Sequence, residues 1–204
     1  MIKKLRVAFI GSRSLHDKSG LEEDIRLCEK VAYRFAELDI VGVSGLCYKG
    51  MDAIMQRQYS RAISEGKAFQ SQLEVYVAKQ TDIHRSRLPN KHLAKVRNPA
   101  LKRETEAMAS RYHHAWHNCS PDARGLHSRN CHIIFGYKLD KPVDAVVAWC
   151  ELDRNNEPMG GTGVAIRMAL DANIPVFNLY LPDKKATLNQ IRNFLKYKKV
   201  WYVK

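Results

Sequence analysis

Runs of apolar residues alternate along the chain with longer segments in which apolar residues recur every three or four positions. The runs predict strands that are buried on both faces, at residues 5–10, 40–44, 73–78, 145–150 and 175–179. The periodic segments predict amphipathic helices at 21–38, 51–65, 100–117 and 126–135, from residue 162, and at 186–197. This alternation predicts an α/β protein with three layers, in which helices cover both faces of a mostly parallel sheet.

Polar residues mark where several of these elements begin and end. Ser19 and Glu22 have the spacing of a capping box, and Gly66 follows the helix at 51–65. Residues 120–125 interrupt the helical periodicity, and residues 79–98 lose it altogether. Because no repeat, low-complexity tract or linker divides the 204 residues, we expect a single domain, with a basic, histidine-rich loop and helical insertion at about 79–130.

The most informative turn follows the apolar run at 145–150. Polar or flexible residues lead from it into Gly160, Gly161 and Thr162, which open the next helix. Glycines let the backbone approach an anion without an intervening Cβ, and the free amides and positive dipole end of the helix point at that anion. The turn therefore predicts a phosphate site, with Gly161 at a positive φ where the phosphate meets the backbone.

Three more polar segments are expected to meet this turn, because ligands bind at the carboxyl ends of parallel strands. Each segment alone is also compatible with an ordinary turn or surface pair, and the chain contains neither GxGxxG nor GxxxxGK[ST]. The guanidinium of Arg129 can donate two hydrogen bonds to a phosphate. Asn130 or Asp52 can contact the sugar or the base. The predicted ligand-binding residues are Gly11, Ser12, Arg13, Ser44, Gly45, Asp52, Arg129, Asn130, Gly160, Gly161 and Thr162.

Composition narrows the range of partners. The formal net charge is +13, and basic residues outnumber acidic ones from Lys79 to Arg129. This charge attracts anions, either nucleotides or nucleic acid, so single-stranded DNA is a candidate partner. The five cysteines form no CxxC pair and suit reduced thiols. No apolar run is long enough to span a membrane, and the first residues lead directly into a strand, so we expect a cytoplasmic protein without membrane contact.

Several short motifs occur in a recognisable order: Gly11-Ser12-Arg13, Ser44-Gly45 with residues 49–53, residues 126–130, Gly160-Gly161-Thr162 with residues 165–167, and residues 174–179. This order resembles the SLOG superfamily, in particular its DprA-like and YspA-like branch, which includes small phage-encoded proteins. The resemblance implies a Rossmann-like fold that binds nucleotides or nucleoside phosphates, and a homo-oligomer with pockets near its interfaces. Members include sensors of cyclic or NAD-derived signals, lysine-decarboxylase-like phosphoribohydrolases that release a base from a nucleoside monophosphate, and DprA, which loads recombinase on single-stranded DNA.

The chain departs from the hydrolase branch at the position of its catalytic acid. Proteins of that branch carry a motif similar to PGGxGTxxE, whose glutamate works with an upstream arginine. Here Ala165 stands where the glutamate would be, although Arg129 fits the arginine. Glu151 and Glu157, in the loop before the glycine turn, are the candidate substitutes. We therefore expect a sensor or sequestering protein that binds a nucleotide or an NAD-derived, ADP-ribose-derived or cyclic signal. Phosphoribohydrolase activity and DprA-like DNA binding are the alternatives, and no cofactor is expected.

Histidines and a cysteine in the basic region have part of the spacing of a metal site. His113 and His117 are four residues apart on the predicted helix, which puts both rings on one face, and Cys119 follows them. No HExxH or paired CxxC motif completes a site, and histidines beside a phosphate pocket can serve as hydrogen-bond donors. We therefore expect no metal, with His113, His117 and Cys119 as the candidates if one binds.

Overall fold

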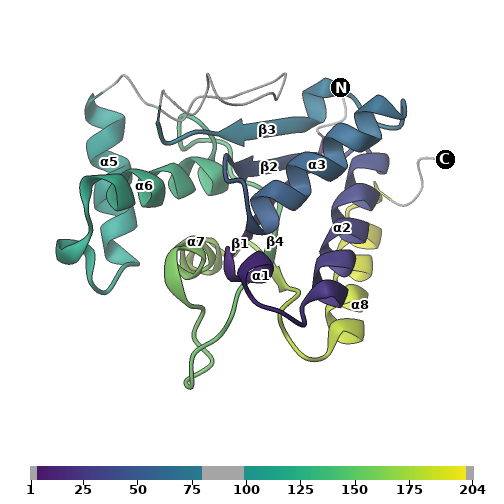
Figure 1. Ribbon diagram of the computed structural model, residues 1–204. Coiled ribbons are helices and arrows are strands. Elements are labelled where there is room, and N and C mark those ends of the chain that lie inside the picture. Colours follow the sequence, from purple (N-terminus) through teal and green to yellow (C-terminus); the bar gives the residue numbers. More distant parts are fainter. Residues whose placement is uncertain (1–3, 80–98, 201–204) are drawn as a thin grey trace.

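The computed structural model describes residues 4–79 and 99–200, and five strands in these ranges form one sheet (Figure 1). Their order is β3-β2-β1-β4-β5, and all four pairings are parallel. The order reverses between β1 and β4, which is where open α/β sheets bind ligands. The predicted α/β fold with a parallel sheet is confirmed. The strands are β1 (Arg6–Gly11), β2 (Val41–Gly45), β3 (Leu73–Tyr76), β4 (Ala145–Trp149) and β5 (Val176–Asn178).

Helices cover both faces of this sheet. Side chains alternate between the faces of a strand, so Val7 and Phe9 of β1 point to one side and Ala8 and Ile10 to the other. The first side packs against α2 (Glu22–Glu37), α3 (Gly50–Ser64) and α8 (Lys184–Tyr197), and the second against α6 (Pro121–Phe135) and α7 (Gly160–Asp171). The helix α5 (Pro99–Arg111) packs outside these layers, beside α6 (Figure 1).

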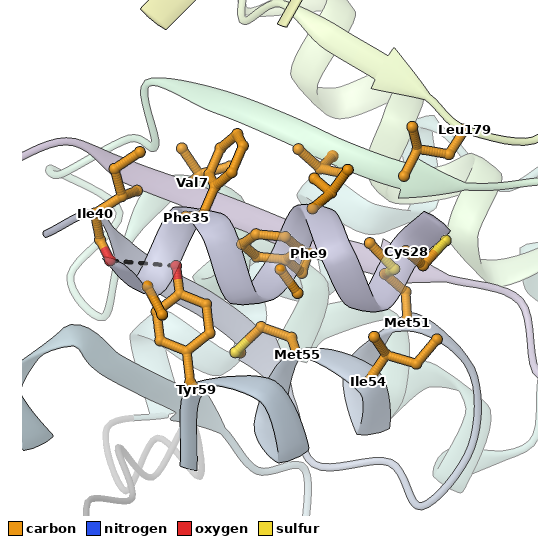
Figure 2. Packing of buried hydrophobic residues seen from close by; sticks show 14 of the residues in the cluster. Val7, Phe9, Cys28, Phe35, Ile40, Met51, Ile54, Met55, Tyr59 and Leu179 are labelled. Atoms are coloured by element: carbon orange, nitrogen blue, oxygen red, sulfur yellow. Dashed lines mark hydrogen bonds between the residues drawn. The ribbon is translucent and has the colours of Figure 1, made fainter. Parts of the chain in front are cut away.

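Aromatic rings fill the larger of the two cores. Phe9 lies edge-on to Phe35, with ring centroids 5.7 Å apart, and to Tyr59, with centroids 6.0 Å apart (Figure 2). The buried hydroxyl of Tyr59 donates a hydrogen bond of 3.2 Å to the carbonyl oxygen of Ile40, so its polar end is satisfied. This packing fixes α2 and α3 against β1 and β2, and thereby sets the position of the turns at the carboxyl ends of those strands.

Several predicted boundaries are wrong, each for a local reason. No capping box forms at Ser19, because α2 begins at Glu22 with Leu21 as its N-cap. The helix expected at 100–117 ends at Arg111 and is followed by a short 3-10 helix, η2 (Trp116–Asn118). Residues 120–125 do not interrupt a helix but open α6. The Ser120 hydroxyl accepts a hydrogen bond of 3.2 Å from the amide of Ala123, and proline occupies the first helical position, where its missing N–H costs nothing.

Candidate functional site

A cavity of about 470 Å³ lies at the carboxyl end of β1, next to the point where the strand order reverses. Its size is within the range of small-molecule sites. Its walls come from the turns after β1 and β2, the start of α3, one face of α6 and the start of α7, the helix that follows β4. Nine of the eleven predicted ligand-binding residues line it, although they come from segments far apart in the sequence. They are Gly11, Ser12, Arg13, Asp52, Arg129, Asn130, Gly160, Gly161 and Thr162.

A buried ion pair forms the floor of the cavity. Nη1 of Arg129, on α6, lies 3.5 Å from Oδ2 of Asp52, in the first turn of α3, and only about a tenth of each side chain is exposed. The Ser44 hydroxyl lies 3.0 Å from Oδ1 of Asp52 and 2.7 Å from the carbonyl oxygen of Phe9. Burial raises the pKa of Asp52 to about 6, against the opposing effects of the Arg129 guanidinium and the Ser44 hydroxyl. Asp52 is therefore poised to change charge close to neutral pH.

Two predicted residues, Ser44 and Gly45, do not line the cavity but contact the ion pair of Asp52 and Arg129 in its floor. Ser44 lies beneath Asp52, as described above. Gly45 ends β2 directly against Arg129, and an ideal Cβ on Gly45 would lie 1.5 Å from Nη1 of the guanidinium. The missing side chain thus makes the space in which Arg129 reaches Asp52. Nε of Arg129 is also buried, and it has no hydrogen-bond partner among the described residues.

The glycine turn lines the cavity beside α6 and begins α7 at Gly160. Its N-cap residue, Met159, supplies no side-chain hydrogen bond, so the first amides of the helix are left to an external acceptor. Nδ2 of the Asn130 side chain donates a hydrogen bond of 3.2 Å to the carbonyl oxygen of Gly161, which ties this turn to α6.

Each glycine of this turn has its own structural requirement. The positive φ expected at Gly161 belongs instead to Gly160, whose φ is +62°. A Cβ on Gly161 would lie 3.3 Å from Cε1 of His127, at the cavity wall, and one on Gly163 would lie 2.0 Å from the carbonyl oxygen of Pro158. Gly160 therefore sets the backbone path, Gly161 keeps the wall open, and Gly163 allows the preceding loop to pack against the helix.

The two glutamates considered as catalytic acids lie outside the residues that line this cavity. Glu151 is hydrogen-bonded to the Ser14 hydroxyl at 3.0 Å and forms an ion pair with Lys18, which lowers the pKa of this carboxyl. The amide of Glu157 donates to Oδ1 of Asp153 within the loop before α7. Among the described lining residues, Asp52 is the only acidic one, and Ala165 contributes an apolar wall.

The sequence interpretation selected Asn130 on α6 but missed three other residues of this helix that line the cavity, which are Ala123, Leu126 and His127. The spacing of the four residues, at three, four and seven positions, is that of a single helix face. The helix was expected to begin only at residue 126, so Ala123 fell outside it. The signal that could have revealed it is the sequence Ser120-Pro121-Asp122, which has the N-cap and first-turn residues of a helix start.

The candidate metal ligands are rearranged relative to expectation. His113 follows the end of α5, and His117 lies in η2, so the two do not share one helix face. Instead, ligand atoms of His113, Cys119 and His127 lie within 4.8 Å of one another. His127 was not among the candidates, because these were chosen on the spacing of His113 and His117 in a helix expected at 100–117.

Much of the basic region that suggested DNA binding falls on residues 80–98, outside the described residues. That segment includes Arg85, Arg87, Lys91 and Lys95. At its borders, Lys79 pairs with Asp122 at 2.6 Å and Lys102 with Glu106 at 3.8 Å. These pairs are largely exposed, and exposed ion pairs of this kind contribute little to stability.

The chain matches no protein-family model, no curated protein and no solved structure. The resemblance to the SLOG superfamily, and the homo-oligomer that it implies, therefore stay predictions. Within residues 4–79 and 99–200, no helix has the length and apolar character needed to cross a membrane.

Proposed function

We propose that the cavity between the carboxyl end of β1 and the start of α7 binds a nucleotide or a nucleotide-derived phosphorylated ligand, and that the protein acts as a sensor or sequestering protein. One observation carries this proposal: nine residues selected for ligand chemistry, from four separate segments, line the same cavity. That cavity lies where the strand order reverses, which is the usual ligand position in open α/β sheets.

The walls suggest how such a ligand would be oriented. A phosphate would lie at the start of α7, where the backbone of Gly160, Gly161 and Thr162 presents amides and the positive end of the helix dipole. Arg129 and Arg13, which also line the cavity, would balance its charge. The sugar or base would extend toward α6, where Asn130 has polar atoms and Leu126 an apolar surface.

The cavity chemistry favours binding over hydrolysis of an N-glycosidic bond. Ala165 lines the cavity at the position where the resemblance calls for a catalytic glutamate, and Glu151 is engaged by Lys18 and Ser14. Phosphoribohydrolase activity remains the second candidate because of Asp52. Its raised pKa, about 6, is suited to general acid or base catalysis.

A ligand screen tests this proposal directly. The purified protein is heated in the presence of AMP, GMP, NAD, ADP-ribose and cyclic dinucleotides, and native mass spectrometry counts bound molecules. A ligand at a hundred times its Kd stabilises the folded state by about 2.7 kcal/mol, which for a chain of this size raises Tm by roughly 5–10 °C. A shift with at least one of these ligands that is lost in Arg129→Ala supports the proposal. No shift and no bound nucleotide across the panel would overturn it.

A further inference from the structure

Three potential metal ligands converge beside the cavity, from three different segments. His113 follows α5, Cys119 follows η2, and His127 lies on α6. The nearest ring nitrogen of His113 is 3.6 Å from Sγ of Cys119, and the rings of His113 and His127 have centroids 4.6 Å apart. All three ligand atoms lie within 4.8 Å of one another.

These separations suit a shared metal ion. With Zn–N bonds near 2.0–2.1 Å and Zn–S bonds near 2.3 Å, tetrahedral geometry places neighbouring ligand atoms about 3.3–3.7 Å apart. The contact between His113 and Cys119 already has this length, and a ligand atom of His127 lies within 4.8 Å of both. Thiolate and imidazole ligands together select zinc or a similar transition metal rather than magnesium or calcium.

The burial of His127 and its unpaired ring nitrogen also support a shared metal ion. Only 8% of this residue is exposed, and its Nδ1 is buried without a hydrogen-bond partner among the described residues. An unpaired buried polar atom is costly, and in native proteins it calls for an explanation. A thiol-to-imidazole hydrogen bond would account for Cys119 and His113 but not for His127, whereas a metal engages all three residues.

The surroundings of His127 also favour metal binding. The Trp116 ring lies beside both histidines, with centroids 6.2 Å from His113 and 6.0 Å from His127, and gives the cluster an apolar wall.

We propose that His113, Cys119 and His127 bind one zinc ion at the edge of the ligand cavity. Among the described residues, no fourth histidine, cysteine or carboxylate joins the cluster. Three protein ligands leave one coordination position for water or another small ligand, as in catalytic rather than purely structural zinc sites. His127 also lines the ligand cavity and lies near Gly161, so the metal would be adjacent to the glycine turn. The inference does not depend on the identity of the nucleotide.

Cobalt substitution tests this site in the full-length protein. The metal-stripped protein is titrated with Co²⁺, and the thiolate-to-cobalt charge-transfer absorption is followed before Zn²⁺ is added as competitor. We expect one cobalt per chain and full displacement by zinc. Cys119→Ser should abolish the charge-transfer band, and His113→Ala and His127→Ala should each abolish stoichiometric binding. Native mass spectrometry of the unstripped protein, grown with zinc, should show one zinc per chain.

Two control variants distinguish metal binding at this site from non-specific metal binding to other histidines and thiols. His117→Ala removes the neighbouring histidine that lies outside the cluster, and Cys47→Ser removes another partly accessible thiol. Both should bind cobalt and zinc as the parent protein does, with unchanged circular dichroism. The proposal is overturned if the parent protein binds no stoichiometric metal, if the band survives Cys119→Ser, or if His117→Ala abolishes it.

Discussion

The guanidinium of Arg129 lies in the space that a side chain on Gly45 would occupy, because an ideal Cβ there would be 1.5 Å from Nη1. This contact joins the end of β2 to α6 across the floor of the cavity. It directs the guanidinium toward Asp52, with which it pairs at 3.5 Å. The guanidinium of Arg129 can therefore occupy this position only because residue 45 is a glycine.

Gly45→Ala should displace Arg129 while leaving the fold intact, because the clashing atoms belong to the end of a flexible side chain. The loss of a charge-assisted contact to a bound phosphate costs about 1.5–3 kcal/mol, which is roughly a tenfold to hundredfold loss of affinity. Titration calorimetry with the nucleotide found in the screen measures this loss. Gly125→Ala is the matched control, since a Cβ at that helical position meets no atom within 4 Å. Equal affinities in the two variants would show that Arg129 does not contact the ligand.

Asp52 should make stability depend on pH. Its pKa is near 3.8 when unfolded and about 6 when folded, so the folded state binds the proton more tightly. Ionisation of Asp52 therefore removes stability as pH rises from about 4 to about 6. A difference of two pK units corresponds to about 3 kcal/mol, all of it lost above the folded pKa.

Asp52→Asn isolates this effect, because the amide does not titrate. The variant should gain about 3 kcal/mol relative to the parent protein between pH 4 and pH 7, as measured by urea unfolding at each pH. Taking the difference between the two proteins cancels the other titrating groups. Parallel stability curves over this range would mean that Asp52 ionises normally despite its burial beside Ser44 and Arg129.

The cavity should release little or no free base from nucleoside monophosphates, because Ala165 stands where the hydrolases that the sequence resembles would have their catalytic acid. Chromatography of reactions with AMP, GMP, CMP and UMP measures the released base. Rapid release would contradict the proposal of a binding protein. In that event, loss of activity in Asp52→Asn but not in Glu151→Gln or Glu157→Gln would identify Asp52 as the acid or base.

The DNA-binding alternative makes a separate prediction about salt. If the basic segment contacts a nucleic-acid backbone, the affinity for single-stranded DNA should fall linearly with salt on a log–log scale. Neutralising Arg85, Arg87, Lys91 and Lys95 together should reduce both the affinity and the slope. Fluorescence anisotropy with a labelled oligonucleotide measures both quantities. If no binding occurs at low salt, the positive charge serves to attract small anions only.

The sequence was sufficient to predict the sheet and much of the cavity, because both depend on local patterns. Buried parallel strands are continuous apolar runs, and the turns that follow them are rich in glycine and polar residues. Topology brings such turns to one edge of the sheet, so Gly11 and Gly161 could be placed together without coordinates.

Contacts between distant segments could not be predicted in this way. The pairing of Gly45 with Arg129 depends on where α6 crosses the end of β2, which no local pattern specifies. Likewise, His127 meets His113 and Cys119 only because α6 begins at Pro121 and the preceding chain folds back over it. The error at residues 120–125 placed Ala123 outside its helix, and the error at residues 100–117 put His113 and His117 on one helix face in place of the observed cluster.

Substitution of Gly161 tests most directly whether a phosphate binds against the backbone at the start of α7. A valine there would project into the cavity, where the Cβ alone already lies 3.3 Å from His127. Titration calorimetry compares Gly161→Val with the parent protein, using the nucleotide identified in the screen, and circular dichroism verifies that the variant is folded. We predict that the folded variant shows no measurable nucleotide binding. A folded Gly161→Val protein that binds its nucleotide with unchanged affinity would contradict the claim and place the phosphate elsewhere.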